Sequence, residues 1–314
     1  MSINSICILG GSGFVGRHIV ARLSAMGKQV RVLTRRKTSC QNLLVLPGVE
    51  LVETHVHDQH KLDQAIKGMD AVINLIGILN EKGHSGEGFR RAHVELPRKV
   101  LNACHHNKVK RILHMSALHA DANSGPSHYL RSKGEGENHM LAFAGKIPVT
   151  SFRPSVIFGA DDSFFNRFGQ LLAMMPLVFP LACAESRFAP VYVGDVADAF
   201  VDALHNKQTW GQRIDLCGPR SYTLKQLVEY TAHTMGLKRW VIPLPDLLSR
   251  LQAQLLEFAP GKPFSIDNYH SLSVDSICDT GYSMPTSIES VVPYYLGKNR
   301  RQLLQDRQRK LAGR

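Results

Sequence analysis

Tyr129 and Lys133 stand four residues apart, in a segment that is predicted to be helical. In a helix this spacing places the phenol and the ammonium on one face. A free tyrosine, with a pKa of about 10, is a poor base at neutral pH, but a neighbouring cation stabilises its phenolate and lowers that pKa. Such a pair could pass a proton to or from a carbonyl or hydroxyl group. The same spacing also occurs by chance on helix surfaces, so its context decides the interpretation.

A glycine-rich turn near the N-terminus supplies that context. It consists of Gly10, Gly11, Ser12, Gly13, Phe14, Val15 and Gly16. An apolar run precedes it and an apolar pattern of helical spacing follows it, as a G-x-G-x-x-G phosphate-binding turn requires. Gly11 allows the tight turn, Gly13 lets the backbone approach a pyrophosphate, and Gly16 lets the helix pack on the strand. The helix N-terminus would then attract the phosphates.

The end of the second predicted strand is basic. It contains Arg35 and Arg36, between Thr34 and Lys37, and no acidic residue. A carboxylate there would bind a free ribose 2′-hydroxyl, whereas a guanidinium binds a 2′-phosphate. We therefore expect NADP(H) rather than NAD(H), the alternative being a merely solvated basic loop. The phenol of Tyr129 would exchange a proton while the nicotinamide exchanges a hydride.

Strands and helices alternate along the first half of the chain, which predicts an α/β fold of the Rossmann type with a doubly wound parallel sheet. A smaller C-terminal substrate lobe is expected to follow. The predicted strands are 5–9, 29–34, 49–52, 71–76, 111–115 and 148–152. The longer predicted helices are about 89–107 and the one carrying Tyr129. We expect a Rossmann domain over 1–157, to which the later segment 188–216 also belongs. The substrate lobe is expected to consist of 158–187 and 217–297, followed by a basic tail at 298–314.

Two further features of the second half lead to expectations. Asp195 is expected to cap a helix that runs to about Leu204. A helical stripe of large apolar residues is interpreted as core rather than as a membrane contact. The stripe consists of Leu247, Leu248, Leu251, Leu255 and Phe258.

Composition narrows the class of protein. The 314 residues include six cysteines without a C-x-x-C pair, which predicts neither a disulfide framework nor a zinc site and favours a reducing cytosolic compartment. No secretory signal is recognised, and the longest apolar run, 171–184, is shorter than the roughly 20 residues that cross a bilayer. Among His55, His57 and His60, the alternating pair could share a strand face, but no carboxylate or third ligand follows at a recognised spacing, so we expect no metal.

Half of the net charge of +12 lies at the C-terminus. Residues 298–314 contain seven basic residues and one acidic residue, which is a net charge of +6. A solvated terminal helix is the simplest interpretation, and contact with an anionic membrane surface is the main alternative. No specific nucleic-acid partner is expected. The predicted location is cytoplasmic, with peripheral attachment to the inner membrane as the alternative.

These motifs together resemble the short-chain dehydrogenase/reductase superfamily in its extended or atypical, NAD-dependent epimerase/dehydratase-like branch. The segment from Arg153-Pro154 to Gly159 is similar to the branch's R-P-x-x-x-x-G segment, and 190–197 to its "PVxVxDVA" segment. Within the branch, segments 74–77, 114–116, 129–133 and 264–267 resemble the family of the accessory NADPH-binding subunit of mitochondrial complex I and its bacterial relatives.

The resemblance implies roles for particular residues. Leu75, Ile76 and Gly77 would end a strand near the nicotinamide ribose, and Lys133 would bond that ribose. Tyr129 would be the acid/base, with Ser116 as a further catalytic and cofactor-contacting residue. Pro154 would also contact the cofactor.

The resemblance leaves three functions open. The favoured one is an NADP(H)-dependent reductase or dehydrogenase with a lipophilic substrate, such as a quinone or a prenylated precursor, because 171–184 is apolar. Leu118 stands where the branch usually has a Ser or Thr, which instead favours a non-catalytic structural or assembly factor with bound NADPH among quinone-pathway or respiratory proteins. A sugar-nucleotide epimerase or dehydratase is the third.

Overall fold

The computed structural model describes residues 2–259, 262, 264–279 and 282–297. The chain divides into two compact units, one formed by Met1–Pro154 and Gly194–Leu216, the other by Ser155–Val193 and the chain from Cys217 onward. Residues 155–157 and 188–193, which the sequence assigns to the Rossmann domain, thus lie in the second unit. They do so because β7 (Ile157–Phe158) and β10 (Val191–Tyr192) pair with each other as a separate small sheet. The basic tail, 298–314, lies outside the described residues.

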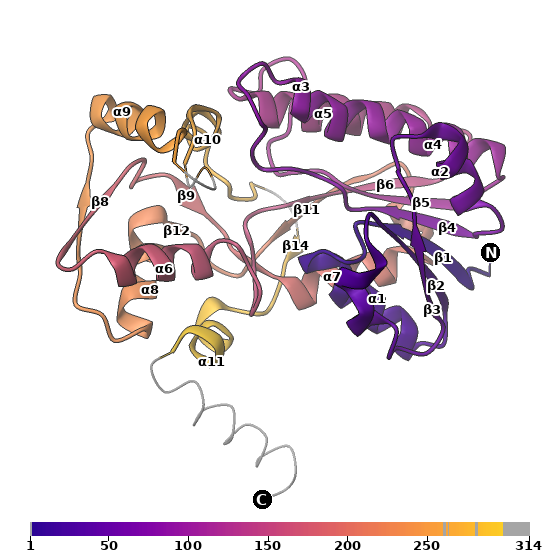
Figure 1. The fold of residues 1–314 in the computed structure, drawn as a ribbon, viewed down its shortest axis with the longest axis horizontal. Helices are drawn as coiled ribbons and strands as arrows, with labels where there is room; N and C mark the ends of the chain where they lie inside the picture. Colours follow the sequence, from indigo (N-terminus) through magenta and orange to yellow (C-terminus); the bar gives the residue numbers. More distant parts are fainter. Residues whose placement is uncertain (1, 260–261, 263, 280–281, 298–314) are drawn as a thin grey trace, which may run out of the picture. The chain divides into compact units, whose positions relative to one another are not determined.

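A parallel sheet forms the centre of the first unit (Figure 1). The strands of this unit lie in the order β11-β6-β5-β4-β1-β2-β3 and pair in parallel. These strands are β1 (Ser5–Leu9), β2 (Gln29–Thr34), β3 (Val49–Glu53), β4 (Ala71–Asn74), β5 (Arg111–Met115), β6 (Val149–Pro154) and β11 (Arg213–Cys217). The Rossmann-type fold class predicted from the alternating pattern is confirmed.

Helices cover both faces of this sheet, as the buried strands β4 and β5 require. Figure 1 shows α2, α4 and α5 on one face and α1 and α7 on the other. The helical segments are α1 (Phe14–Ala25), η1 (Lys37–Leu43), α2 (Gln59–Ile66), α3 (Glu87–Arg90), η2 (Arg91–Glu95), α4 (Leu96–His106), α5 (His128–Ala142), α7 (Val193–Ala203) and η3 (Lys207–Thr209).

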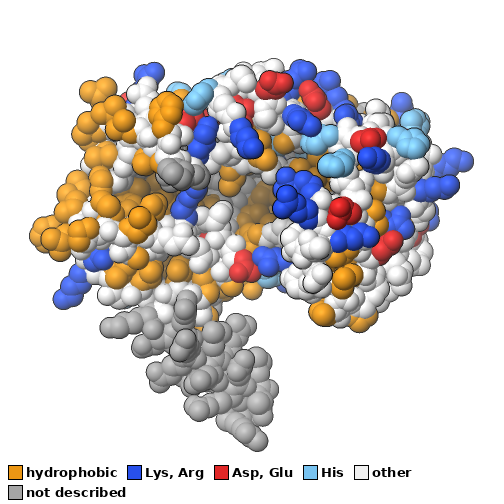
Figure 2. Space-filling view, viewed as in Figure 1, with side chains coloured by type: hydrophobic (Ala, Val, Ile, Leu, Met, Phe, Trp, Pro, Cys, Tyr) orange, Lys and Arg blue, Asp and Glu red, His pale blue; other side chains and the backbone are white. Residues whose placement is uncertain are grey.

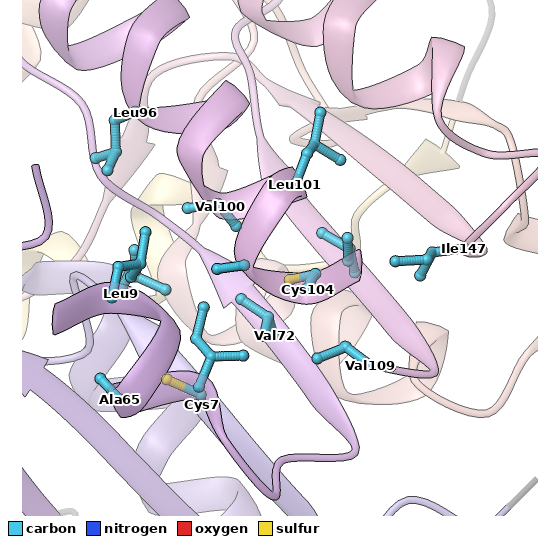
Figure 3. Packing of buried hydrophobic residues seen from close by; sticks show 14 of the residues in the cluster. Cys7, Leu9, Ala65, Val72, Leu96, Val100, Leu101, Cys104, Val109 and Ile147 are labelled. Atoms are coloured by element: carbon cyan, nitrogen blue, oxygen red, sulfur yellow. The ribbon is translucent and has the colours of Figure 1, made fainter. Parts of the chain in front are cut away.

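One cluster of buried apolar side chains fills the space between the sheet and the helices α2, α4 and α5 (Figure 3). Cys7 and Leu9 from β1 and Val72 from β4 meet Val100 and Cys104 from α4 there. Burial raises the pKa of the Cys7 thiol to about 12, so this cysteine acts as a small apolar residue. The cluster holds the ends of β1 and β4 side by side, where the site is built.

The second unit contains short strands and helices around its own aromatic-rich core. Its strand pairs are β7 with β10, β8 (Val178–Leu181) with β13 (Trp240–Pro243), and β9 (Arg187–Phe188) with β12 (Tyr222–Thr223). The remaining elements are α6 (Phe165–Met174), α8 (Leu224–Thr234), α9 (Asp246–Leu256), α10 (Ile266–Ser271), β14 (Tyr282–Ser283), η4 (Ile288–Ser290) and α11 (Val292–Leu296). Phe158, Phe165 and Leu227 lie at the centre of this core. No helix among the described residues is long and apolar enough to span a membrane.

Three expectations from the sequence are wrong in this half of the chain. Cys217 and Cys278 form a disulfide across 61 residues, and their spacing does not predict this pairing. The bond also removes the argument that scattered cysteines indicate a reducing compartment. Helix α7 begins at Val193, so Asp195 lies in its first turn and is not its cap.

The third correction concerns the apolar stripe of α9, which is not core. All five side chains are exposed: Leu247, Leu248, Leu251, Leu255 and Phe258. The helix instead packs through its smaller residues Ser249 and Ala253.

Candidate functional site

The glycine-rich turn joins β1 to α1 in the first unit. Gly10 has φ +81°, and a side chain there would lie 3.3 Å from Cβ of Leu75. At Gly16 a Cβ atom would lie 2.3 Å from the carbonyl oxygen of Gly10 and 2.5 Å from Cα of Gly11. These close approaches bring α1 down onto β1 and place the turn beside the end of β4.

Gly13 differs from its neighbours because it is exposed. A Cβ atom there would meet only the Gly10 carbonyl oxygen, at 3.2 Å, and otherwise open space. Gly13 is also the N-cap of α1, and it offers no side-chain cap. The first turn of α1 contains no acidic residue. The N–H groups of this helix terminus therefore need an acceptor, and a pyrophosphate fits that need.

The side chains of Arg35 and Arg36 are exposed directly after β2. Neither guanidinium forms a hydrogen bond or ion pair with the described part of the chain, so both are available to an anion. The acidic residue that contacts this loop is Glu53, whose carboxylate accepts a hydrogen bond of 2.9 Å from the Lys37 backbone N–H. Arg35, Arg36 and Lys37 outnumber this single carboxylate, so the loop remains basic.

Helix α5 carries both Tyr129 and Lys133, as predicted. It begins after Ser127, whose hydroxyl accepts a hydrogen bond from the Leu130 N–H at 3.0 Å. Lys133 is only 4% exposed, and its Nζ donates to the carbonyl oxygen of Met115 at 3.0 Å. Burial lowers the pKa of Lys133 to about 8, an effect that the charge of Glu137 partly offsets. The ammonium is therefore a cation at neutral pH that can lose its proton in mild alkali.

Lys133 lies close to the end of β4. A Cβ atom on Gly77 would come within 2.9 Å of the Lys133 Nζ. Any larger residue at position 77 would press on the ammonium. The structure thus brings Gly77 and Lys133 together with the segment of Leu75 and Ile76, as the resemblance implies.

Tyr129 is half-buried beside two other rings. Its ring meets His93 edge-on at 5.5 Å between centroids, and Phe89 at 6.1 Å. These contacts restrict the directions that the phenol can take and support a defined orientation for it.

Ser116 follows β5 and is buried. Its backbone N–H donates to the Phe152 carbonyl oxygen at 2.7 Å, which ties the end of β5 to β6. Its Oγ, by contrast, has no hydrogen-bond partner in the described part of the chain. A buried hydroxyl without a partner is uncommon in folded proteins, and this one is free to bond a bound molecule or water. Gly13 and the α1 terminus thus fit the phosphates of a dinucleotide, and Ser116 offers a free hydroxyl near the end of β5.

Leu118 lies two residues beyond Ser116 and is buried. Its backbone N–H donates to the Pro154 carbonyl oxygen at 3.2 Å, which links the segment after β5 to the end of β6. Its side chain has no hydroxyl to offer a reacting oxygen. Of the two positions, only Ser116 can therefore supply one.

Sequence reasoning missed His93, which lies in the π-helical segment η2 and is buried. Its Nε2 accepts a hydrogen bond from the Ile78 N–H at 3.0 Å, and its Nδ1 lies 2.9 Å from Oγ of Ser132. The Ser132 hydroxyl donates to the Tyr129 carbonyl oxygen at 2.9 Å. Single π-helical turns are frequent at functional sites, but nothing in the spacing of fifteen histidines singles this one out.

The pKa of His93 is lowered to about 2 by burial and by the nearby Lys133 cation. The imidazole is therefore neutral at physiological pH. Since Nε2 accepts from Ile78, the proton of the neutral ring is on Nδ1 and is donated to Ser132. His93 thus links the segment after β4 to the turn of α5 that carries Tyr129.

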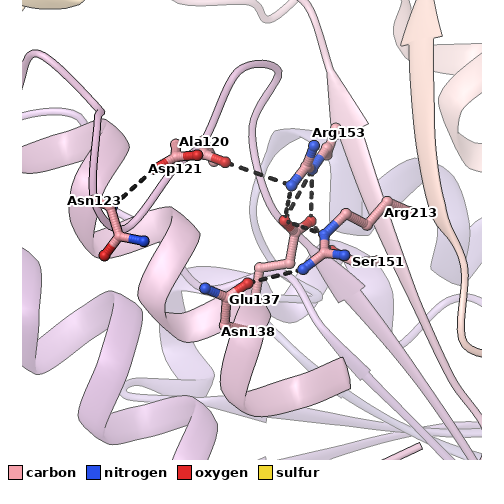
Figure 4. A network of polar contacts seen from close by, with 8 residues as sticks. All are labelled: Ala120, Asp121, Asn123, Glu137, Asn138, Ser151, Arg153 and Arg213. Atoms are coloured by element: carbon pink, nitrogen blue, oxygen red, sulfur yellow. Dashed lines mark hydrogen bonds and ion pairs between the residues drawn. The ribbon is translucent and has the colours of Figure 1, made fainter. Parts of the chain in front are cut away.

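A buried carboxylate, Glu137, fixes the same helix to the sheet (Figure 4). It accepts from Nε of Arg153 at 2.9 Å, from Nε of Arg213 at 3.0 Å and from Oγ of Ser151 at 2.7 Å. Burial alone would raise the pKa of Glu137, but the hydrogen bonds from these groups outweigh it, and the pKa is lowered. The network joins α5 to β6 and β11. Arg153, which directly precedes Pro154 in the R-P-x-x-x-x-G segment, therefore has a structural role in this network.

No group of three or more His, Cys, Asp or Glu side chains among the described residues could hold a metal ion.

The fold and this site define a dinucleotide-binding protein of the Rossmann type. The model of the NAD dependent epimerase/dehydratase family matches residues 6–217, and the chain belongs to that family. The resemblance inferred from the motifs is thus confirmed. Membership supports a nicotinamide dinucleotide as the cofactor.

Two relatives and one solved structure show how the family varies. The mitochondrial NADH dehydrogenase (ubiquinone) 1 alpha subcomplex subunit 9 of Mus musculus is 28% identical over 278 residues, which cover 87% of this chain and 72% of the relative. The ceramide reductase of Caulobacter vibrioides is 32% identical over 243 residues, 77% of this chain and 74% of the relative. The UDP-glucose 4-epimerase of Thermus thermophilus, solved with NAD, has a TM-score of 0.64 at 20% identity and covers 84% of this chain and 98% of its own, a likeness of fold alone.

Proposed function

We propose that the protein is an NADP(H)-dependent reductase that acts on a carbonyl group of a lipophilic molecule. The observation that carries the proposal is the combination of Tyr129 and the buried Lys133 on α5 with the unpartnered hydroxyl of Ser116, among the described residues. These groups belong to the first unit, which also contains the glycine-rich turn. Proton transfer and cofactor binding are thus served by one unit of the chain.

The choice of NADP(H) rests on the loop after β2. Arg35 and Arg36 are exposed there, and the acidic group that contacts the loop, Glu53, is bonded to its backbone. A 2′-phosphate would gain a charge-assisted hydrogen bond from either arginine, whereas a free 2′-hydroxyl would gain no such ion pair.

The residues of the chain have distinct tasks in this mechanism. NADPH, when bound, supplies the hydride. Tyr129 donates its phenolic proton to the carbonyl oxygen, and Ser116 donates a hydrogen bond to the same oxygen. Lys133, as a cation, stabilises the phenolate that Tyr129 leaves behind, and the neutral His93 orients the helical turn of Tyr129 through Ser132. Because the pKa of Lys133 is about 8, the rate should fall as the pH rises above that value.

Support for a lipophilic substrate comes from two sources. Segment 171–184 is apolar along its length, with Phe179 and Leu181 in the core of the second unit and Leu177 exposed. The relative from Caulobacter vibrioides is a reductase named for a lipid. A quinone or a prenylated precursor remains within the proposed class.

A second function is favoured by one observation. Leu118 occupies the position where a hydroxyl would assist the reaction, and it is buried against the end of β6. A subunit that keeps NADPH as a permanent ligand would not need that hydroxyl. The mouse relative, a subunit of a respiratory NADH dehydrogenase, is compatible with this role.

The two functions are separated by following NADPH absorbance after mixing the holoprotein with acceptors. The acceptors are a long-chain β-keto lipid in micelles, a short-chain quinone and UDP-glucose. We expect oxidation with one of the lipophilic acceptors, lost by at least about 100-fold in Tyr129→Phe, the lower range for removal of a general acid. Tyr222→Phe, a tyrosine of the second unit that is bonded to Glu289, is the control and should keep the wild-type rate.

Other outcomes would contradict the proposal. If NADPH binds tightly but stays reduced with every acceptor, the structural role replaces the enzymatic one. Turnover of UDP-glucose alone would move the protein to the sugar-nucleotide enzymes.

A further inference from the structure

Helix α9 of the second unit exposes its large apolar side chains, whereas a helix of the core would bury them. Its buried positions are small, with Ser249 and Ala253 facing inward. The large side chains face outward, with Leu247 78% and Leu255 65% exposed. A helix that only packed on the core would reverse this arrangement.

The adjacent strand pair repeats the pattern. Phe179 in β8 and Val241 in β13 point into the core, while Val178 and Trp240, which are register partners, are exposed. Trp240 is 76% exposed. Alternation along a strand places consecutive side chains on opposite faces, so this pair presents one apolar face outward.

Helix and strands are joined directly. The Leu244 N–H donates to the Leu181 carbonyl oxygen at 2.9 Å, and Nε2 of Gln252 donates to the Pro180 carbonyl oxygen at 3.2 Å. Figure 2 shows hydrophobic side chains gathered over α9 and β8. We name this surface the α9–β13 face, and define it by Leu247, Leu251, Leu255, Phe258, Val178 and Trp240. Exposed apolar surfaces of this kind mark interaction sites.

The charges around the face are mostly basic. Lys238 and Arg239 directly precede Trp240, and Arg250 is exposed on α9. The acidic groups on α9 are Asp246, which accepts a hydrogen bond from the hydroxyl of Tyr269, and Glu257 at the C-terminal end of the helix. An anionic occupant would complement this border, whereas the basic segment 298–314 of the same chain would not.

We propose that the α9–β13 face seats the protein on a lipid bilayer that contains anionic headgroups. An exposed tryptophan beside lysine and arginine, next to leucine and phenylalanine, is the composition that favours a membrane interface. The face offers almost only carbon, whereas a protein partner would expect about one hydrogen bond per 100–200 Å² of interface. The exposed side chains of Lys238 and Arg250 can extend to the headgroups while the leucines enter the acyl boundary, whereas the guanidinium of Arg239 is bonded to the Leu172 carbonyl oxygen.

The test uses the full-length protein and vesicles of phosphatidylcholine with or without phosphatidylglycerol. Binding is measured by co-sedimentation at low salt and at about 1 M NaCl, where the Debye length is about 3 Å and charge-only attraction is screened. The variant combines Leu247→Ser with Leu255→Ser. Its matched control combines Leu44→Ser with Val45→Ser, two exposed apolar residues of the first unit. Both pairs are exposed, so both variants should fold, which circular dichroism checks.

We expect the Leu247/Leu255 variant to lose at least about tenfold in partitioning while the control keeps wild-type binding, because two buried leucines are removed from the lipid. Some wild-type binding should persist at high salt. The emission of Trp240 should shift to the blue on vesicles that contain phosphatidylglycerol.

Three results would overturn the inference. The first is equal binding by the Leu247/Leu255 variant and the wild type, since another surface would then be responsible. The second is complete loss of wild-type binding at high salt. The third is a dimer, detected by light scattering, that the variant dissociates while vesicles are not bound, because the face would then belong to a second copy. None of these measurements depends on catalysis, so failure here and failure of the reductase assay are distinguishable.

Discussion

Alanine substitutions at Gly13 and Gly16 should separate cofactor binding from folding. Both glycines belong to the same turn, yet the structure gives them different surroundings. At Gly16 an added Cβ atom would lie 2.3 Å from the Gly10 carbonyl oxygen and 2.5 Å from Gly11 Cα, which are backbone atoms that cannot rotate away. At Gly13 it would meet only one atom, at 3.2 Å.

The magnitudes follow from these distances. Gly16→Ala should destabilise the fold by the typical cost of overpacking, about 1–3 kcal/mol, which lowers the melting temperature by roughly 2–12 °C. Gly13→Ala should cost less than about 1 kcal/mol, the scale of an N-cap change. It should nevertheless weaken NADPH binding by about 100-fold or more, because the new methyl group would occupy the space of the pyrophosphate and break two charge-assisted hydrogen bonds of about 1.5–3 kcal/mol each.

The assay pairs thermal unfolding without cofactor and a fluorescence titration with NADPH, on the wild type and both variants. The expected result is a normal melting temperature with lost binding for Gly13→Ala, and a lowered melting temperature for Gly16→Ala. Binding by Gly13→Ala within about threefold of the wild type would refute the assignment of this turn to the pyrophosphate.

The remaining predictions concern selectivity, pH and the disulfide. Arg35→Ala should weaken NADPH binding by about tenfold and leave NADH binding unchanged, as measured by titration with both, since an exposed guanidinium contributes modestly. The folded-state pKa of Glu137 is lowered, so its contribution to stability is present above the unfolded value of about 4.3 and is lost as the pH falls through the folded value. Urea unfolding should therefore show wild-type stability falling in acid, whereas Glu137→Gln should be less stable at pH 7 by about 3–5 kcal/mol and should lack this part of the pH dependence. Equal unfolding midpoints for both proteins at pH 7 would contradict this role of Glu137. Replacing Cys217 and Cys278 by serine should destabilise the second unit by up to about 4 kcal/mol, as judged by urea unfolding without reductant, and an unchanged midpoint would argue against the bond.

The first unit could be predicted from the sequence because its signals are local. The bounds of β1, β2 and β5 agree with the predicted strands, since continuous apolar runs bounded by turn residues leave little choice. The observed order β3-β2-β1-β4-β5-β6 is the one typical of the doubly wound sheet that the alternating pattern predicts. The glycine-rich turn and the spacing of Tyr129 and Lys133 could also be recognised, because each involves residues that are close together in the sequence.

The features that escaped prediction depend on tertiary packing. His93 becomes part of the site only because α5 approaches η2 so closely that a Cβ atom on Gly136 would overlap the His93 carbonyl oxygen. The leucines of α9 satisfy the helical pattern of a core helix, and a pattern cannot tell which face finds a partner. The partners of Cys217 and of Glu137 lie far along the sequence, at Cys278 and Arg213, where no local signal connects them.

The central claim is that hydride leaves NADPH in this site under the control of Tyr129. The most direct measurement is a single turnover with NADPH deuterated at C4 and a lipophilic carbonyl acceptor, with the product analysed by mass spectrometry. The account predicts one deuterium in the product for the wild type and none within the same time for Tyr129→Phe. Retention of the deuterium in tightly bound NADPH, with no labelled product from any acceptor, would contradict the claim and leave the cofactor as a structural ligand.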